Sequence, residues 1–201
     1  MKDSEKKDTR NKIFIAAAEL FSRDGFYKVS VREICEHANV TKPVLYYYFK
    51  DKETLLLELV KETDRIGEEL KNEYFQCGTS FSEKIFMIAE IYKTFVKTYP
   101  YLLKFNAFAQ FMNMPEEVRN HKTNMSKRGM EELSVLFKNA QKDGFLNEEN
   151  NIDMLIRSFI GPIILLLSQF MLEGNLESFS EDIEKFVKFW LHTYEKKIKE
   201  I

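Results

Sequence analysis

The segment from Ser30 to Lys52 limits most strongly what this chain can fold into. Ser30 is a favourable N-cap, because its hydroxyl can accept a hydrogen bond from a backbone N–H of the first helical turn. Behind it follows an apolar stripe at the spacing of one helix face, formed by Val31, Ile34 and Cys35. The segment therefore predicts a short helix with one buried side.

A tight turn and a second short helix follow in the same segment. Asn39 stands where a left-handed turn residue is needed, and Asn tolerates that conformation better than other residues with a side chain. Thr41 can cap the next helix, and Pro43 is acceptable in its first turn because that N–H has no partner within the helix. Two helices joined in this way predict a helix-turn-helix, a motif that binds DNA.

The remaining sequence also predicts helices. Apolar residues recur at helical spacing between caps and terminators, and no alternating strand pattern or repeat is present. We expect an all-α chain of about nine helices, with a long fourth helix that carries the chain out of the N-terminal unit. Besides the two short helices, the predicted segments are Thr9–Asp24, Asp51–Phe75, a helix capped by Ser80 or Ser82 and ending near Tyr99, Tyr101–Met112, Glu116–Lys142, Ile152–Leu172 and a last helix capped by Ser180.

Charge is distributed unevenly along the 201 residues, whose net charge is −2. Residues 1–50 carry ten Lys and Arg against seven Asp and Glu, a net of +3, which leaves −5 for the remainder. A basic N-terminal unit is compatible with a nucleic-acid contact at that end of the chain, although an excess of three charges is weak evidence alone. The basic residues before the first helix predict a disordered arm that either touches the DNA backbone or only aids solubility: Lys2, Lys6, Lys7, Arg10 and Lys12.

No signal for secretion or membrane insertion is expected. The charged N-terminus lacks an apolar segment, and the apolar run from Phe159 to Leu172 is too short for a bilayer and is interrupted by Gly161-Pro162. We interpret that run as a buried helix and the protein as cytoplasmic.

Groups that would indicate catalysis or a cofactor are absent from the sequence pattern. Cys35 and Cys77 suggest neither a disulfide framework nor a zinc site, and Glu117 with His121 offers only two metal ligands. There is no glycine-rich phosphate loop and no nucleophile motif. We therefore expect no enzyme, no metal and no cofactor.

Taken together, several short motifs resemble the N-terminal domain of the TetR/AcrR transcriptional regulators over about residues 9–55. They are Leu20-Phe21, Gly25-Phe26, Val31–Ile34, Val40–Lys42 and Leu45–Glu53. The resemblance implies a DNA-binding domain at 1–52 and a ligand-binding and dimerisation domain at 53–201. It also implies a homodimer whose recognition helices enter successive major grooves of a palindromic operator, about 34–36 Å apart. The expected activity is that of a repressor released by a small hydrophobic or aromatic effector, with a pocket among the fourth to eighth helices and dimerisation through the last two.

The predicted DNA contacts centre on the start of the second short helix. Lys42 can donate to guanine, Thr41 to a phosphate, and Val44 can touch a thymine methyl group. Three successive tyrosines cannot all face the core, so at least one is displayed. The full set of expected DNA contacts, in which Arg32 and Lys52 clamp phosphates, is Ser30, Arg32, Thr41, Lys42, Pro43, Val44, Tyr46, Tyr47 and Lys52.

The expected effector contacts come from an aromatic and methionine-rich middle region, which suits an apolar pocket with a few polar anchors. Core packing is the alternative for each of them taken singly. The candidates are Tyr74, Tyr92, Phe105, Asn106, Phe108, Gln110, Met112 and Gln169.

Two other functions remain open from the sequence. One is a helical interaction module or small-molecule-binding protein without operator-specific DNA binding. The other is a small helical enzyme, which the lack of a paired acid and base or a nucleophile argues against.

Overall fold

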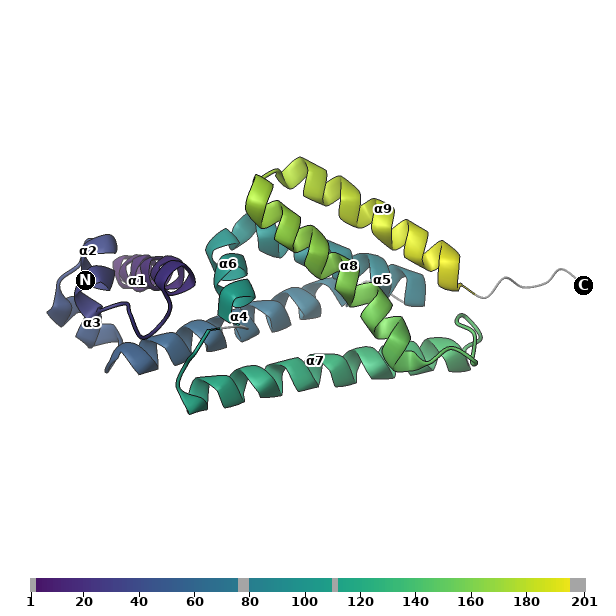
Figure 1. Ribbon diagram of the computed structural model, residues 1–201, viewed down its shortest axis with the longest axis horizontal. Coiled ribbons are helices and arrows are strands. Elements are labelled where there is room, and N and C mark those ends of the chain that lie inside the picture. The colour runs from purple at the N-terminus through teal and green to yellow at the C-terminus, as the bar shows by residue number, and fades with distance from the viewer. Residues whose placement is uncertain (1–2, 76–79, 110–111, 196–201) are drawn as a thin grey trace, which may run out of the picture. The chain divides into compact units, whose positions relative to one another are not determined.

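The computed structural model describes residues 3–75, 80–109 and 112–195. Within these ranges the chain forms nine α-helices and no β-strand (Figure 1). The prediction of an all-α fold is confirmed. In chain order the helices are α1 (Asp3–Asp24), α2 (Val31–His37), α3 (Lys42–Tyr48), α4 (Lys52–Phe75), α5 (Phe81–Thr98), α6 (Pro100–Ala109), α7 (Glu116–Lys142), α8 (Ile152–Glu173) and α9 (Leu176–Tyr194).

Helix α1 begins earlier than the sequence pattern predicted. The expectation of a disordered basic arm is wrong from Asp3 onward, while Lys2 lies outside the described residues. Opposite charges one turn apart support the added turns, since the Lys12 ammonium lies 2.6 Å from the Asp8 carboxylate. The Arg10 guanidinium lies over the Phe14 ring, 4.3 Å from its centroid.

Two further boundaries differ. Helix α6 is described as far as Ala109 and Met112 is not helical, while α9 begins at Leu176 rather than after Ser180. Asn175 caps α9, with its side chain accepting a hydrogen bond from the Ser178 N–H. Because Asn is as good an N-cap as Ser, residue preference alone could not choose between the two positions.

The chain divides into two compact units. The first contains residues up to 66 together with 98–125, and the second contains 67–97 and 126–201. Each unit therefore joins segments that are distant in the sequence. The expected boundary between a DNA-binding domain at 1–52 and a ligand-binding and dimerisation domain at 53–201 remains a prediction.

The first unit is built on phenylalanines from α1, the loop after it and the end of α3. Phe14 meets Phe49 with ring centroids 5.3 Å apart, and Phe21 meets Phe26 at 5.4 Å. These rings are buried, and α6 packs against α1 within the same unit. This packed core supports α2 and α3.

The second unit has an aromatic core around Trp190 of α9. Its ring lies 5.6 Å from Phe137 and 5.2 Å from Phe159, centroid to centroid, and its Nε1 donates to the Ser158 hydroxyl at 3.0 Å. A buried indole N–H requires such a partner. The aromatic residues of this core are packed against one another.

Helix α8 is longer than the apolar run that marks it in the sequence. Over Ile152–Glu173 it is long and apolar enough to cross a membrane by length and composition alone, which for one such helix is not an indication of a membrane span. Its character is one-sided, however. Leu155, Ile156, Phe159, Ile163 and Leu167 are buried, whereas the opposite side exposes apolar side chains.

Candidate DNA interface and effector site

A reciprocal capping arrangement starts α2. The Ser30 Oγ accepts a hydrogen bond from the Glu33 N–H at 3.2 Å, and the Glu33 carboxylate accepts one from the Ser30 N–H at 2.7 Å. These hydrogen bonds hold the pKa of the Glu33 carboxyl below its usual range. The predicted N-cap is confirmed, and the Ser30 side chain is exposed at the surface.

Asn39 shapes the turn between α2 and α3. Its φ of 52° is the one positive value outside glycine among the described residues, as its place in the sequence predicted. The turn closes with a hydrogen bond from the Val40 N–H to the Cys35 carbonyl at 2.9 Å. This geometry sets the direction in which α3 leaves α2.

The start of α3 is open to solvent. Thr41 has the extended backbone of an N-cap, but its hydroxyl makes no capping hydrogen bond. Thr41, Lys42 and Pro43 are exposed, and Val44 is half-buried. The hydroxyl and ammonium groups at this end are therefore available to a ligand.

The rest of α3 separates into a packed side and a displayed side. Leu45 is fully buried, whereas the side chains of Tyr46 and Tyr47 are 50% and 66% exposed. Tyr48 is half-buried and its ring meets Tyr47 edge-on at 5.0 Å. The structure thus exposes the two tyrosines that the sequence selected as DNA contacts.

Arg32 lies on the exposed surface of α2. Its Nε donates to the Glu36 carboxylate at 2.7 Å, one turn further along the helix. An exposed ion pair of this kind is screened by water and contributes little to stability, so a phosphate can compete for the guanidinium.

Lys52 occupies a different position from the one expected of a phosphate clamp. Its ammonium donates to the carbonyls of Phe26 and Val29, at 2.8 Å each, and lies 4.3 Å from the centroid of the Phe26 ring. Burial lowers the pKa of this lysine. The sequence could not show this because the two carbonyls belong to a loop more than twenty residues earlier.

That loop carries two exposed side chains that the sequence reasoning did not select. Tyr27 is 60% exposed and Lys28 is exposed beside it, directly before the cap of α2. The sequence did contain a signal for them, because an aromatic and a basic residue stand next to each other in the short loop between Gly25 and Ser30.

The predicted effector residues are divided between the two units. Tyr74 and Tyr92 belong to the second unit, and Gln169 is exposed on α8, where its Nε2 donates to Glu173 at 3.0 Å. The Tyr74 hydroxyl lies 2.7 Å from that of Thr94, and burial raises the pKa of Tyr92. Gln110 lies outside the described residues.

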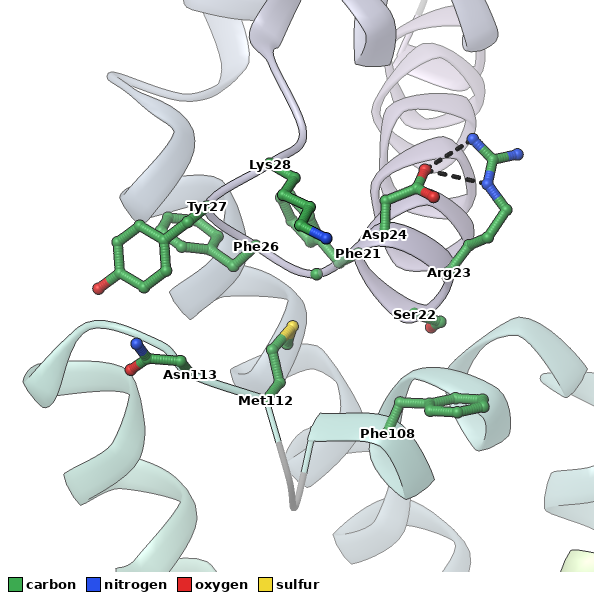
Figure 2. Close-up of a pocket in the computed structure, with 11 residues that line it drawn as sticks. Phe21, Ser22, Arg23, Asp24, Phe26, Tyr27, Lys28, Phe108, Met112 and Asn113 are labelled. Carbon is green, nitrogen blue, oxygen red and sulfur yellow. Dashed lines mark hydrogen bonds and ion pairs between the residues drawn. The ribbon is translucent and has the colours of Figure 1, made fainter.

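The other predicted effector residues belong to the first unit. Phe105 is fully buried, and the backbone carbonyl of Asn106 accepts a hydrogen bond from the Lys122 ammonium at 3.3 Å. Phe108 and Met112 come together at an open depression of about 400 Å³, which Figure 2 shows. Its other side is formed by the end of α1 and the loop after it, and the remaining lining residues are Phe21, Ser22, Arg23, Asp24, Gly25, Phe26, Tyr27, Lys28 and Asn113.

A second depression, between α5 and α9, is lined mostly by charged side chains. Lys93 bridges Glu90 at 2.7 Å and Glu184 at 2.6 Å there. This surface contains none of the predicted effector residues. Among the residues that the structure describes, no three His, Cys, Asp or Glu side chains are grouped to hold a metal ion.

A small three-helix unit that displays the start and one side of its third helix has the architecture of a helix-turn-helix DNA-binding protein. Residues 13–59 match the family model described as bacterial regulatory proteins, tetR family. Residues 13–59 therefore carry the DNA-binding domain of the tetR family of bacterial regulatory proteins, and the relatives that match this chain are transcriptional regulators.

Two relatives match this chain over different shares of its length. The chain is 26% identical to the HTH-type transcriptional regulator QacR of Staphylococcus aureus, over 91% of this chain and 96% of that protein. It is 37% identical to AcrR of Shigella flexneri over 35% of this chain and 33% of that protein.

Solved structures show the same fold. The ketosteroid transcriptional regulator KstR2 of Mycobacterium tuberculosis matches with a TM-score of 0.78 at 13% identity, covering 94% of this chain and 95% of that one. FadR of Bacillus subtilis, solved in complex with stearoyl-CoA, matches with a TM-score of 0.70 at 17% identity, covering 90% and 97%. Members of the family bind DNA and small-molecule effectors, typically as dimers, and are soluble and typically cytoplasmic.

Proposed function

We propose that this regulator binds a palindromic operator as a homodimer, acts as a repressor, and is released by a small hydrophobic effector. The observation that carries the proposal is the surface of α3, where Thr41, Lys42, Tyr46 and Tyr47 are exposed while Leu45 is fully buried. Side chains at the start of such a helix reach base edges in the major groove.

The DNA contacts divide by role. Lys42 and Val44 are assigned to base edges, and Thr41, Tyr46 and Tyr47 to bases or the neighbouring phosphates. Ser30 and Arg32 approach the backbone from α2, and Pro43 holds the start of α3 in place. Phosphate contacts position the protein, whereas base contacts select the sequence.

Selection of bound genomic fragments, followed by gel shifts at several salt concentrations, tests operator binding. Lys42→Ala is expected to weaken operator binding by about 1–3 kcal/mol, roughly 5- to 150-fold, and to relax the preference at one base position. Lys138→Ala is the matched control, because it removes one exposed lysine from α7, outside the proposed DNA and dimer interfaces. Unchanged affinity and sequence preference in both Lys42→Ala and Tyr46→Ala would show that α3 is not the reading helix.

Dimerisation is assigned to α8 and α9. Both helices belong to the second unit and pack against each other, and their outer sides expose large apolar residues: Met154, Ile164, Leu165, Leu172 and Phe189. An exposed apolar face of this size marks an interaction site, and a twofold axis lets one face cover its own copy.

The effector proposal is supported by the apolar lining of the depression beside Phe108 and Met112, and by the stearoyl-CoA bound to FadR. Tyr74, Tyr92, Phe105 and the remaining candidates stay predictions. For release, the effector must bind the DNA-incompetent state more tightly, since equal affinity for both states shifts nothing.

Stearoyl-CoA, free stearate and an aromatic carboxylate are suitable first probes. Each is titrated into the protein–operator complex, and the change in bound operator is compared with direct binding to the free protein. A compound that binds the free protein without changing operator occupancy is not the effector. Phe108→Ala and Met112→Ala are expected to weaken the response, with operator affinity in the absence of effector retained.

The rival function is a helical module that binds a partner or small molecule without recognising an operator. Weak, strongly salt-dependent binding to all fragments alike would favour it, because that behaviour reflects phosphate contacts alone.

A further inference from the structure

The loop between α1 and α2 is attached to the first residue of α4. Lys52 reaches back across more than twenty residues, and its ammonium donates to the Phe26 and Val29 carbonyls at 2.8 Å each. The same ammonium lies 4.3 Å from the centre of the Phe26 ring, which is itself 2% exposed. Two hydrogen bonds and a cation–π contact thus fix one side chain.

This arrangement explains how a partly buried ammonium is tolerated. Removing a charge from water is costly unless hydrogen bonds replace its hydration. Two of the three ammonium donors are used by carbonyls, and the ring face contributes a further attraction. A lysine that clamps phosphates has the opposite requirement, because its ammonium has to remain exposed and mobile.

The attachment lies immediately before α2. The Val29 carbonyl belongs to the residue that precedes Ser30, and Ser30 both caps α2 and exposes its hydroxyl. Arg32 follows two residues later. The position of these two side chains therefore depends on where the Val29 carbonyl is held.

We propose that Lys52 is a positioning residue, which holds the start of α2 against the start of α4 so that Ser30 and Arg32 reach the DNA backbone. This role rests on the proposed operator binding. It also makes α4 a carrier of both short helices, since α4 follows α3 directly and holds α2 through Lys52. A displacement at the start of α4 would then move both DNA-contacting helices together.

The first test uses the protein without DNA. Hydrogen exchange is measured at the Val29, Ser30 and Glu33 amides, all of which donate hydrogen bonds in this region. Lys52→Met keeps the aliphatic stem and removes the donors, so exchange at these amides is expected to accelerate roughly tenfold or more.

Lys50→Met is the matched control, since Lys50 is exposed two residues away. It is expected to leave the three amides protected. Unchanged exchange in Lys52→Met overturns the positioning role. Lys52→Gln, which can still donate to a carbonyl, serves as a second variant if Lys52→Met does not fold, and is expected to show a smaller acceleration in the same amides.

The second test is a double-mutant cycle on operator affinity with Arg32→Ala. If Lys52 places Arg32, the two substitutions are non-additive, and Arg32→Ala costs less once Lys52 is gone. If Lys52 were an independent phosphate clamp, the costs would add, the salt slope would fall by about one, and the loop amides would stay protected.

The two tests separate this proposal from the function on which it rests. Wild-type protein that binds no selected fragment refutes operator binding and with it the DNA role of Lys52. Wild-type protein that binds its operator, combined with additive costs in the cycle, refutes the positioning role alone.

Discussion

Replacement of Leu165 by Glu is expected to separate the proposed homodimer. On α8, Leu165 is 69% exposed, and it lies on the same side as Met154 and Leu172, which are 63% and 88% exposed. The spacings of eleven and seven residues return to one helix face. This face is opposite the buried residues that pack into the second unit.

The magnitude follows from burial. Covering a whole leucine side chain contributes about 1.5–3 kcal/mol, so covering the exposed two-thirds of Leu165 contributes about 1–2 kcal/mol. A twofold interface contains the residue twice, and an unpaired carboxylate in place of each leucine adds several kcal/mol of desolvation. The dimer dissociation constant is therefore expected to rise roughly a thousandfold or more, which corresponds to about 4 kcal/mol.

Sedimentation equilibrium over a range of protein concentrations measures this change. Val135→Glu is the control, because Val135 is a 59% exposed apolar residue on α7. The control is expected to leave the dimer intact, and both variants are expected to keep the wild-type helix content. A Leu165→Glu protein that dimerises as tightly as wild type would refute the assignment of this face.

Three further substitutions test individual features of the fold by urea denaturation. Asn39→Ala is expected to destabilise the protein by about 1–2 kcal/mol, because alanine at the left-handed φ of 52° lacks the local hydrogen bonding of Asn, whereas Asn39→Gly should be close to neutral. Asp51→Ala should cost about 1 kcal/mol at pH 7, since the Asp51 carboxylate caps α4 by accepting the Thr54 N–H at 2.7 Å. Hydrogen bonds from Thr54 lower the pKa of Asp51. The stabilisation by the Asp51 carboxylate is therefore complete above the ordinary aspartate pKa of about 3.9 and is lost as the pH falls through the lowered pKa. The unfolding free energies of wild type and Asp51→Ala should differ at pH 7 and converge in strong acid. Trp190→Ala should cost about 3–5 kcal/mol, because it leaves a cavity in the second unit and removes the hydrogen-bond donor to Ser158.

The helix-turn-helix could be predicted from the sequence because the signals that specify it are local. A serine cap, a left-handed turn residue and an apolar stripe each act within a few residues, and the structure places Ser30, Asn39 and Leu45 as these signals predict. The same local rules gave the wrong start for α9, because Asn175 and Ser180 are both favourable N-caps and the helix begins after Asn175.

The effector candidates show where sequence reasoning ends. Tyr74, Phe105 and Gln169 share a composition that suits a pocket, but composition carries no information about which residues meet. The structure places Phe105 in a core, Gln169 on a surface and Tyr74 in a different unit from Phe105.

The sequence by itself determined the class of fold, the turn that orients α3 and the side chains that α3 displays. Each of these follows from helical periodicity and backbone preference within one short segment. The tertiary structure alone decided the contacts of Lys52 and the apolar side that α8 leaves exposed. The lysine's partners are backbone carbonyls, which every residue has and no sequence pattern marks, and they come within 2.8 Å only once the loop after α1 is packed against the start of α4.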